Sequence, residues 1–148
     1  MSVIIEANFP DLVPNNFLYF LENWATCSKK LNPLIESAEE LEPIQGFNVG
    51  RAVANTPWPL WKRVTFSARY PSVNYKKDEH LFILSERGAE SVIEKNFTEE
   101  DKKTFCLAKL FVAGWHFAPV HSAEGELVGT RILYLISADA GGAIPQSI

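Results

Sequence analysis

The residues with catalytic or metal-binding potential are few, and they do not occur in the patterns that such chemistry requires. The three histidines, His80, His116 and His121, have neither the i,i+4 spacing of helical metal ligands nor an HExxH or HxH motif. Ser85 and Cys106 are nucleophiles by residue type only, because no GxSxG-like turn surrounds either of them. The sequence therefore predicts no metal site, no cofactor and no catalytic nucleophile, and we expect a protein that is not an enzyme.

The acidic and glycine-rich segments do not indicate acid–base catalysis or nucleotide binding either. Neighbouring carboxylates occur at 39–40, 78–79 and 99–101, each inside a polar run that is typical of a solvated loop or face. Gly141 and Gly142 follow an apolar run, but no helix follows them in the sequence, so the free N–H groups of a phosphate loop are missing.

Length, charge and cysteine usage narrow the class of protein further. A chain of 148 residues has the usual size of one domain, so we expect a single domain over 1–148. The formal net charge of −4 provides no positive field for nucleic acid. No apolar run reaches the roughly 18 residues of a membrane span, and the N-terminus lacks the features of a signal peptide. Cys27 and Cys106 stand alone, which is typical of buried thiols in a reducing compartment, and we expect a cytoplasmic protein.

The elements that must position any site follow a definite order. Residues 2–9 form a β-rich run, and 11–33 carry apolar residues at spacings of three, four and seven, which predicts one long or two short helices. About six strands follow, linked by hairpin-length loops, at 34–44, 47–55, 63–70, 79–85, 105–120 and 130–139. Such a run of strands forms an antiparallel sheet that the helical segment covers on one face, and a twisted sheet leaves a gap beneath a straight helix. The fold class is therefore α+β.

Two segments carry a resemblance to a known family. "TPWPLWKRVTFSARY" (56–70) resembles the Pro-rich loop and extended strand of StAR-related lipid-transfer (START) domains, and "TRILYLISADAGGAIPQSI" (130–148) resembles their closing strand and its exit. The resemblance places the chain in the helix-grip, Bet v 1-like superfamily. It implies a curved antiparallel sheet of about six or seven strands wrapped around a helix, with a hydrophobic cavity for a lipid or sterol.

The sequence also departs from the START pattern. START domains generally carry an N-terminal helix and two strands before the position where this sequence begins, and a long C-terminal helix after the position where it ends. We therefore expect a domain that lacks its C-terminal helix. The family's Arg-Asp pair is replaced by Lys62-Arg63-Val64, and its cavity arginine falls near Arg69. No carboxylate occurs within 47–52, where the acidic partner of that arginine is expected.

Large apolar side chains and Arg69 are the candidates for the ligand cavity: Trp24, Phe66, Arg69, Phe82, Phe111, Trp115 and Tyr134. Arg69 and the tryptophans have alternative roles. Arg69 alternates with Thr65 and Ser67 opposite an apolar face, and such polar residues usually face water. The tryptophans can equally be plain core, because aromatic rings bury large areas whatever the function.

Two further groups concern the ends of the cavity. Trp58 and Trp61 lie in a Pro-rich loop where two tryptophans are hard to bury, which indicates contact with a membrane or a protein partner. Asp139, Gly141, Gly142 and Pro145 form a predicted hinge to a lid helix.

Two function classes fit these observations. The first is a lipid-binding or lipid-transfer module that holds one hydrophobic molecule without catalysis. The second is a structural or interaction subunit that keeps the fold without a ligand, with a partner covering the open sheet.

Overall fold

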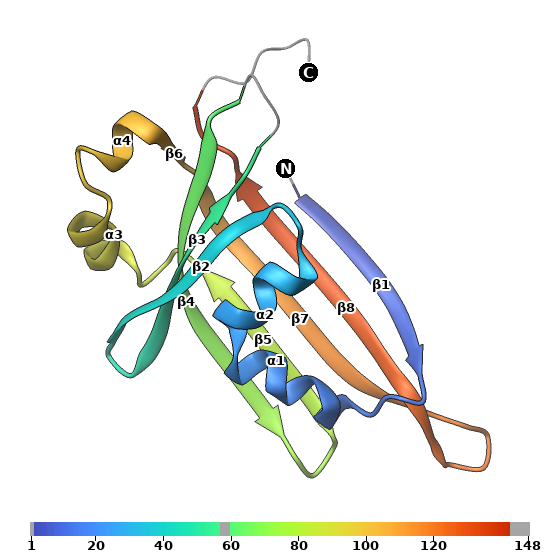
Figure 1. Ribbon diagram of the computed structural model, residues 1–148. Helices are drawn as coiled ribbons and strands as arrows, with labels where there is room; N and C mark the ends of the chain where they lie inside the picture. The colour runs from blue at the N-terminus through green and yellow to red at the C-terminus, as the bar shows by residue number, and fades with distance from the viewer. Residues whose placement is uncertain (1, 57–59, 143–148) are drawn as a thin grey trace.

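A curved eight-stranded sheet with short helices on its concave side forms the body of the protein (Figure 1). The computed structural model describes residues 2–56 and 60–142. The strands are β1 (Ser2–Pro10), β2 (Ile35–Ile44), β3 (Phe47–Ala54), β4 (Lys62–Asn74), β5 (Glu79–Ser85), β6 (Phe105–Leu107), β7 (Lys109–His121) and β8 (Leu127–Asp139). Their order is β1-β8-β7-β5-β4-β3-β2, all antiparallel, and the short β6 pairs in parallel with β4. The predicted α+β architecture is confirmed.

The helical segment is divided into three short pieces. A 3₁₀ turn, η1 (Pro14–Phe17), leads into α1 (Leu18–Glu22) and α2 (Trp24–Leu31). Pro14 occupies the first turn, where its missing N–H costs nothing. Between α1 and α2, Asn23 adopts φ −118° and ψ 41°, which no helical residue has. This break lets the two helices take different directions over the sheet, and α2 then contacts β2.

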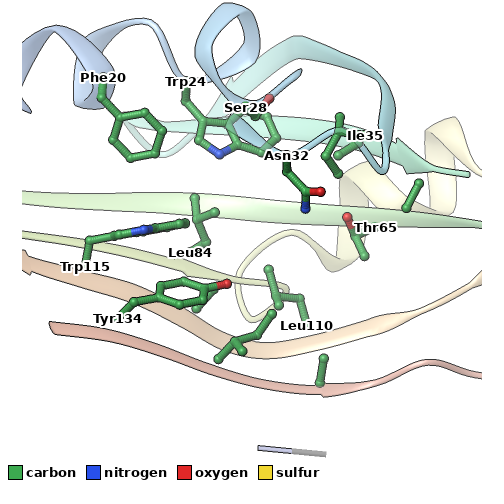
Figure 2. Close-up of a pocket in the computed structure, with 15 residues that line it drawn as sticks. Phe20, Trp24, Ser28, Asn32, Ile35, Thr65, Leu84, Leu110, Trp115 and Tyr134 are labelled. Atoms are coloured by element: carbon green, nitrogen blue, oxygen red, sulfur yellow. The ribbon is translucent and has the colours of Figure 1, made fainter. Parts of the chain in front are cut away.

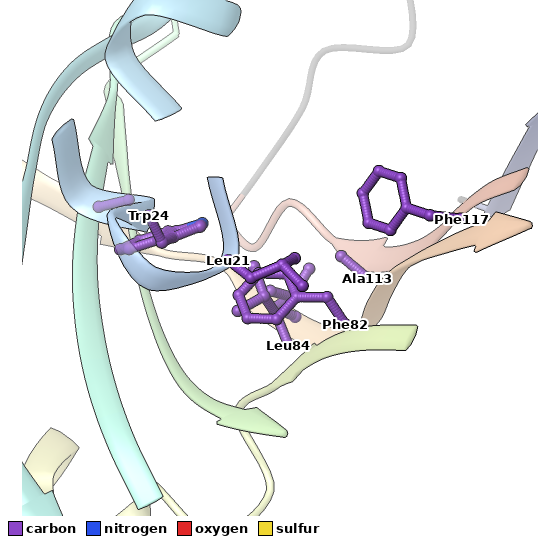
Figure 3. Close-up of a cluster of buried hydrophobic side chains, with 8 residues drawn as sticks. Leu21, Trp24, Phe82, Leu84, Ala113 and Phe117 are labelled. Atoms are coloured by element: carbon purple, nitrogen blue, oxygen red, sulfur yellow. The ribbon is translucent and has the colours of Figure 1, made fainter. Parts of the chain in front are cut away.

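Both faces of the central sheet are buried, each against different helices. On the concave side, a first core contains apolar side chains of α1, α2, β5 and β7, among them Leu21, Trp24, Phe82 and Phe117 (Figure 3). On the convex side, α3 (Glu90–Asn96) and α4 (Asp101–Thr104) follow β5 in the chain, and a second core forms between α3, β3 and β4. The polar segment 86–104 thus supplies a cover for the outer face of the sheet.

This second cover reverses the expected orientation of β4. The alternation in 63–70 predicted an apolar face toward the helix and polar residues toward water. Instead Val64, Phe66 and Ala68 lie in the convex core, and Thr65 lies on the concave side, where it lines a pocket. Because α3 covers the apolar face, the polar face is the one that meets α2. A period-two pattern distinguishes two faces of a strand but not which face lies inside.

The long apolar run 105–120 was predicted as one strand and is two. β6 ends at Leu107 and β7 begins at Lys109. Between them, the Ala108 N–H donates to the Val64 carbonyl at 2.9 Å, which ties this corner to β4. The short β6 therefore borders the start of β4, while β7 crosses the sheet between β5 and β8.

Candidate ligand pocket

A pocket of about 450 Å³ lies between the helices and the concave face of the sheet (Figure 2). Its walls come from α1, α2 and the following turn on one side and from six strands, β2, β3, β4, β5, β7 and β8, on the other. All of its lining side chains are uncharged: Phe20, Trp24, Ser28, Asn32, Ile35, Ala52, Ala54, Thr65, Leu84, Leu110, Ala113, Trp115, Tyr134, Ile136 and Ala138. The volume is within the usual range of small-molecule sites.

Aromatic rings form one wall of the pocket. Phe20 packs edge-on against Trp115, with ring centroids 5.4 Å apart, and Trp115 packs against Tyr134 at 4.8 Å. Phe82 lies behind this wall, 5.7 Å from the Trp115 ring. Because each ring is held by its neighbours, the wall presents a preformed apolar surface to anything in the pocket.

Small residues explain why this region is hollow. Ala52 and Ala54 on β3, Ala113 on β7 and Ala138 on β8 line the pocket where larger side chains would fill it. Gly50 acts in a related way, because a Cβ atom there would lie only 2.4 Å from Cζ3 of Trp24. The absence of a side chain at Gly50 therefore lets the indole lie close to β3.

A few polar groups are distributed within the apolar lining. The Ser28 hydroxyl donates to the Ala25 carbonyl at 3.2 Å, and Oδ1 of Asn32 accepts the Leu34 N–H at 3.0 Å. Figure 2 shows the Asn32 amide directed toward the sheet. In the described part of the chain, the hydroxyls of Thr65 and Tyr134 make no hydrogen bond. Burial raises the pKa of the Tyr134 phenol, so this group is a neutral donor and acceptor.

An ion pair between a buried arginine and a partly exposed glutamate lies next to the pocket but outside its lining. Arg69 is only 4% exposed, and its Nη2 donates to Oε2 of Glu40 on β2. The guanidinium carbon lies 5.7 Å from the centroid of the Trp24 ring, which covers the pair from the helix side. Burial lowers the pKa of Arg69, and the charge of Glu40 opposes that shift.

This pair corrects two expectations about Arg69. The alternative that Arg69 faces water is wrong, because the polar face of β4 lies under α2. The expected acidic partner within 47–52 is absent, as the sequence indicated, but Glu40 on the neighbouring strand supplies it. Arg69 is thus paired and lies beneath Trp24, and it is not a lining residue of the pocket.

The structure separates the other predicted cavity residues. Trp24, Trp115 and Tyr134 line the pocket, whereas Phe82 packs behind Trp115. Whether they contact a ligand stays a prediction.

Two of the predicted cavity residues lie elsewhere. Phe66 points to the convex core, where its ring is 6.4 Å from that of Phe97. Phe111 is 52% exposed, because the register of β7 with β8 shifts between Leu110 and Val112. Such a bulge breaks the alternation of the strand, so Phe111 does not share the face of Ala113 and Trp115.

Sequence reasoning missed Phe20, Asn32 and Thr65 as pocket residues. Phe20 was recognised only as part of the apolar helix face, and Thr65 was assigned to the wrong side of β4. Nothing in the sequence around Asn32 predicted a place in the pocket, because that place depends on where α2 ends.

The predicted loop and hinge are only partly described. Trp61 is 57% exposed, and its carbonyl accepts from Thr56 Oγ1. Gly141 and Gly142 have φ of 67° and 66°, which confirms the expected turn, and Oδ1 of Asp139 accepts the Gly141 N–H at 2.9 Å. Trp58 and Pro145 lie outside the described residues. The roles of loop and hinge stay predictions.

Other chemical groups do not converge on the pocket. Nε2 of His80 lies 3.0 Å from Asn15 Oδ1, and that of His116 lies 2.7 Å from Glu79 Oε1. Among the described residues, no group of three or more His, Cys, Asp or Glu side chains could hold a metal ion. Within the same ranges, no helix is long and apolar enough to cross a membrane.

Solved structures share this fold. The chain matches human STARD10 with a TM-score of 0.72 and 15% identity, over 97% of this chain and 53% of that one. It matches the lipid transfer and protein localization domain of human StarD13 (DLC2) with a TM-score of 0.65 and 16% identity, over 98% of this chain and 64% of that one. A fragment of a STAR-related lipid transfer protein from Xanthomonas axonopodis matches with a TM-score of 0.66 and 14% identity, over 97% of this chain and 72% of that one.

Sequence comparisons add nothing to this likeness, since no family model and no curated protein matches the chain. The chain spans about half the length of the STARD10 structure and 64% of the StarD13 domain. At such low identity the likeness concerns the fold alone. The chain therefore has the helix-grip fold of START domains.

Proposed function

We propose that this protein binds one lipid or other hydrophobic molecule in the pocket and carries it without chemical change. The observation that carries the proposal is a hollow of about 450 Å³ with an entirely uncharged lining, on a fold shared with lipid-transfer proteins. Transfer of apolar surface from water into such a pocket is favourable by roughly 25 cal/mol per Å². No bond-making group is needed for this function.

The polar groups of the pocket restrict the ligand further. The hydroxyls of Thr65 and Tyr134 can each form a hydrogen bond with a bound molecule, but no lining side chain offers a charge. Arg69 is already paired with Glu40 beneath Trp24. A buried charge without a partner is costly, so an uncharged ligand with one hydroxyl or carbonyl group fits better than one with a buried ionic head group.

The loop with Trp58 and Trp61 is proposed to contact the membrane or protein from which the ligand is collected. The described residues on either side of 57–59 support this proposal. The Asn55 N–H donates to the Leu34 carbonyl at 2.8 Å, next to the lining residue Ile35, and Trp61 leads directly into β4. An exposed aromatic side chain at the end of a pocket suits the collection of an apolar molecule from a cytoplasmic membrane surface.

A binding experiment with pocket variants tests the proposal. A fluorescent hydrophobic probe such as an anilinonaphthalene sulfonate or a fluorescent sterol is titrated into the protein. Ala113→Leu fills part of the pocket and should raise the dissociation constant about tenfold or more. A tenfold change corresponds to the loss of about 1.4 kcal/mol of binding free energy. Tyr134→Phe removes one hydroxyl and should weaken binding of the sterol more than that of the sulfonate probe.

Phe111→Ala is the matched control, because this exposed side chain lies on the same strand as Ala113 but outside the pocket. It should leave the affinity unchanged. Equal loss in Phe111→Ala and Ala113→Leu, or no saturable binding of either probe, would contradict the proposal.

A further inference from the structure

The two edges of the sheet differ in how they are protected. Edge strand β2 carries glutamates at four of its ten positions, and its register with β3 shifts twice. These glutamates form ion pairs with basic side chains of neighbouring elements: Glu36 with Lys62, Glu39 with Arg51, Glu40 with Arg69 and Glu42 with Lys95. Charges and irregularities of this kind prevent a sheet edge from pairing with another strand.

Edge strand β1 lacks such protection. Its nine residues contain one charge, Glu6, and its register with β8 is unbroken from Ser2 to Pro10. Ile4 and Ile5 are 69% and 52% exposed. Figure 1 shows β1 as the outermost strand, away from the helices along most of its length. A long, regular and apolar edge is a template for strand addition.

Apolar surface continues from β1 onto the neighbouring strand. Ile5 is opposite Tyr134 and belongs to the concave face, so Ile4 belongs to the convex face, opposite Leu135. Leu133 on the same convex face is 38% exposed. A strand added at this edge would therefore find backbone hydrogen-bonding groups in the plane of the sheet and apolar side chains beside it.

We propose that β1 pairs antiparallel with β1 of a second copy, about a twofold axis at Ile5. In this register Ile5 is opposite Ile5 of the partner copy, and Val3 is opposite Ala7. Glu6 is opposite Ile4, so the two carboxylates do not face each other, whereas a register centred at Glu6 would oppose them. The self-complementarity of this nearly uncharged strand favours a second copy over an unrelated partner. The proposal is independent of the ligand.

The interface is small, so the dimer is expected to form at high concentration and to dissociate on dilution. Sedimentation velocity on the full chain, from low to high micromolar concentration, measures this equilibrium. Ile5→Lys should weaken the dimer about tenfold or more, because two lysines would then lie directly opposite each other at the centre of the pairing. Tyr19→Lys is the matched control, since Tyr19 is an exposed side chain on α1 and is not part of β1, and it should leave the dimer unchanged.

Disulfide formation tests the register. In a background without Cys27 and Cys106, Ile5→Cys should form a covalent dimer on mild oxidation, because residues directly opposite in antiparallel strands have Cβ atoms close enough for a disulfide. Asn8→Cys should not. Circular dichroism establishes that each variant is folded. A chain that stays monomeric at every concentration, a dimer that Ile5→Lys leaves intact, or absence of the Ile5 cross-link overturns the proposal.

Discussion

Removal of the Glu40 carboxylate would leave the Arg69 guanidinium buried beneath Trp24 without its acceptor. Breaking a buried pair in this way costs about 3–5 kcal/mol when both partners are desolvated. The Glu40 side chain is 44% exposed, so water reaches this end of the pair and can hydrate part of the guanidinium. We therefore expect Glu40→Ala to lower the free energy of unfolding by about 2 kcal/mol, below the fully buried case.

Arg69→Met should behave differently, although it removes the same ion pair. Methionine fills much of the space beneath Trp24 without a charge, and Glu40 can turn into solvent. Replacement of a buried charge by an apolar side chain of similar volume is often neutral, so a change within about 1 kcal/mol is expected. Once Arg69 is methionine, removal of Glu40 should have little further effect.

Urea unfolding of the wild type, both single variants and the double variant measures these free energies. Glu42→Ala is the control, because Glu42 lies on the same strand and pairs with Lys95 at the surface, where such pairs contribute about 0–1 kcal/mol. The reasoning is refuted if Arg69→Met is more destabilising than Glu40→Ala, or if Glu40→Ala is no worse than Glu42→Ala.

Two further predictions concern Gly50 and Asp101. Gly50→Ala should displace Trp24, because the new Cβ would lie 2.4 Å from the indole, and overpacking of this kind lowers the free energy of unfolding by about 1–3 kcal/mol. Urea unfolding measures the loss of stability, and the tryptophan emission spectrum of the folded protein measures the displacement. An unchanged spectrum contradicts the prediction. Hydrogen bonds from Thr98 hold the pKa of Asp101 below its usual value, so its stabilising contribution is present above the unfolded-state pKa and is lost as the pH falls through the folded-state pKa. In Asp101→Asn, the free energy of unfolding should therefore decrease less than in the wild type as the pH falls. The same pH dependence of unfolding in variant and wild type would contradict this.

The order of elements and the fold class could be predicted from the sequence, because both depend on local patterns. The spacing of Phe17, Phe20, Leu21 and Trp24 defines a helical face, and the alternation in β4 defines a strand. Trp24, Trp115 and Tyr134, which were predicted for the ligand cavity, line the pocket between helix and sheet.

The orientation of strands and the partners of polar groups could not be predicted, because they depend on distant segments. Phe66 was assigned to the cavity because nothing in 86–104 shows that α3 packs on the opposite face of β4. Glu40 was not recognised as the partner of Arg69, because the pair crosses from β2 to β4 over a glycine. The exposure of Phe111 results from a bulge in β7, which a period-two pattern in the sequence does not reveal.

Native mass spectrometry of the purified full chain tests most directly whether the pocket holds a ligand. The protein is expressed in a lipid-containing host, and its mass is compared before and after extraction with organic solvent. We expect a bound hydrophobic molecule that is uncharged, at one per chain, and that is lost from the pocket-filling variant Ala113→Leu but retained by Phe111→Ala. A folded protein that is free of ligand from every host and takes up none from lipid vesicles would contradict the proposed carrier function.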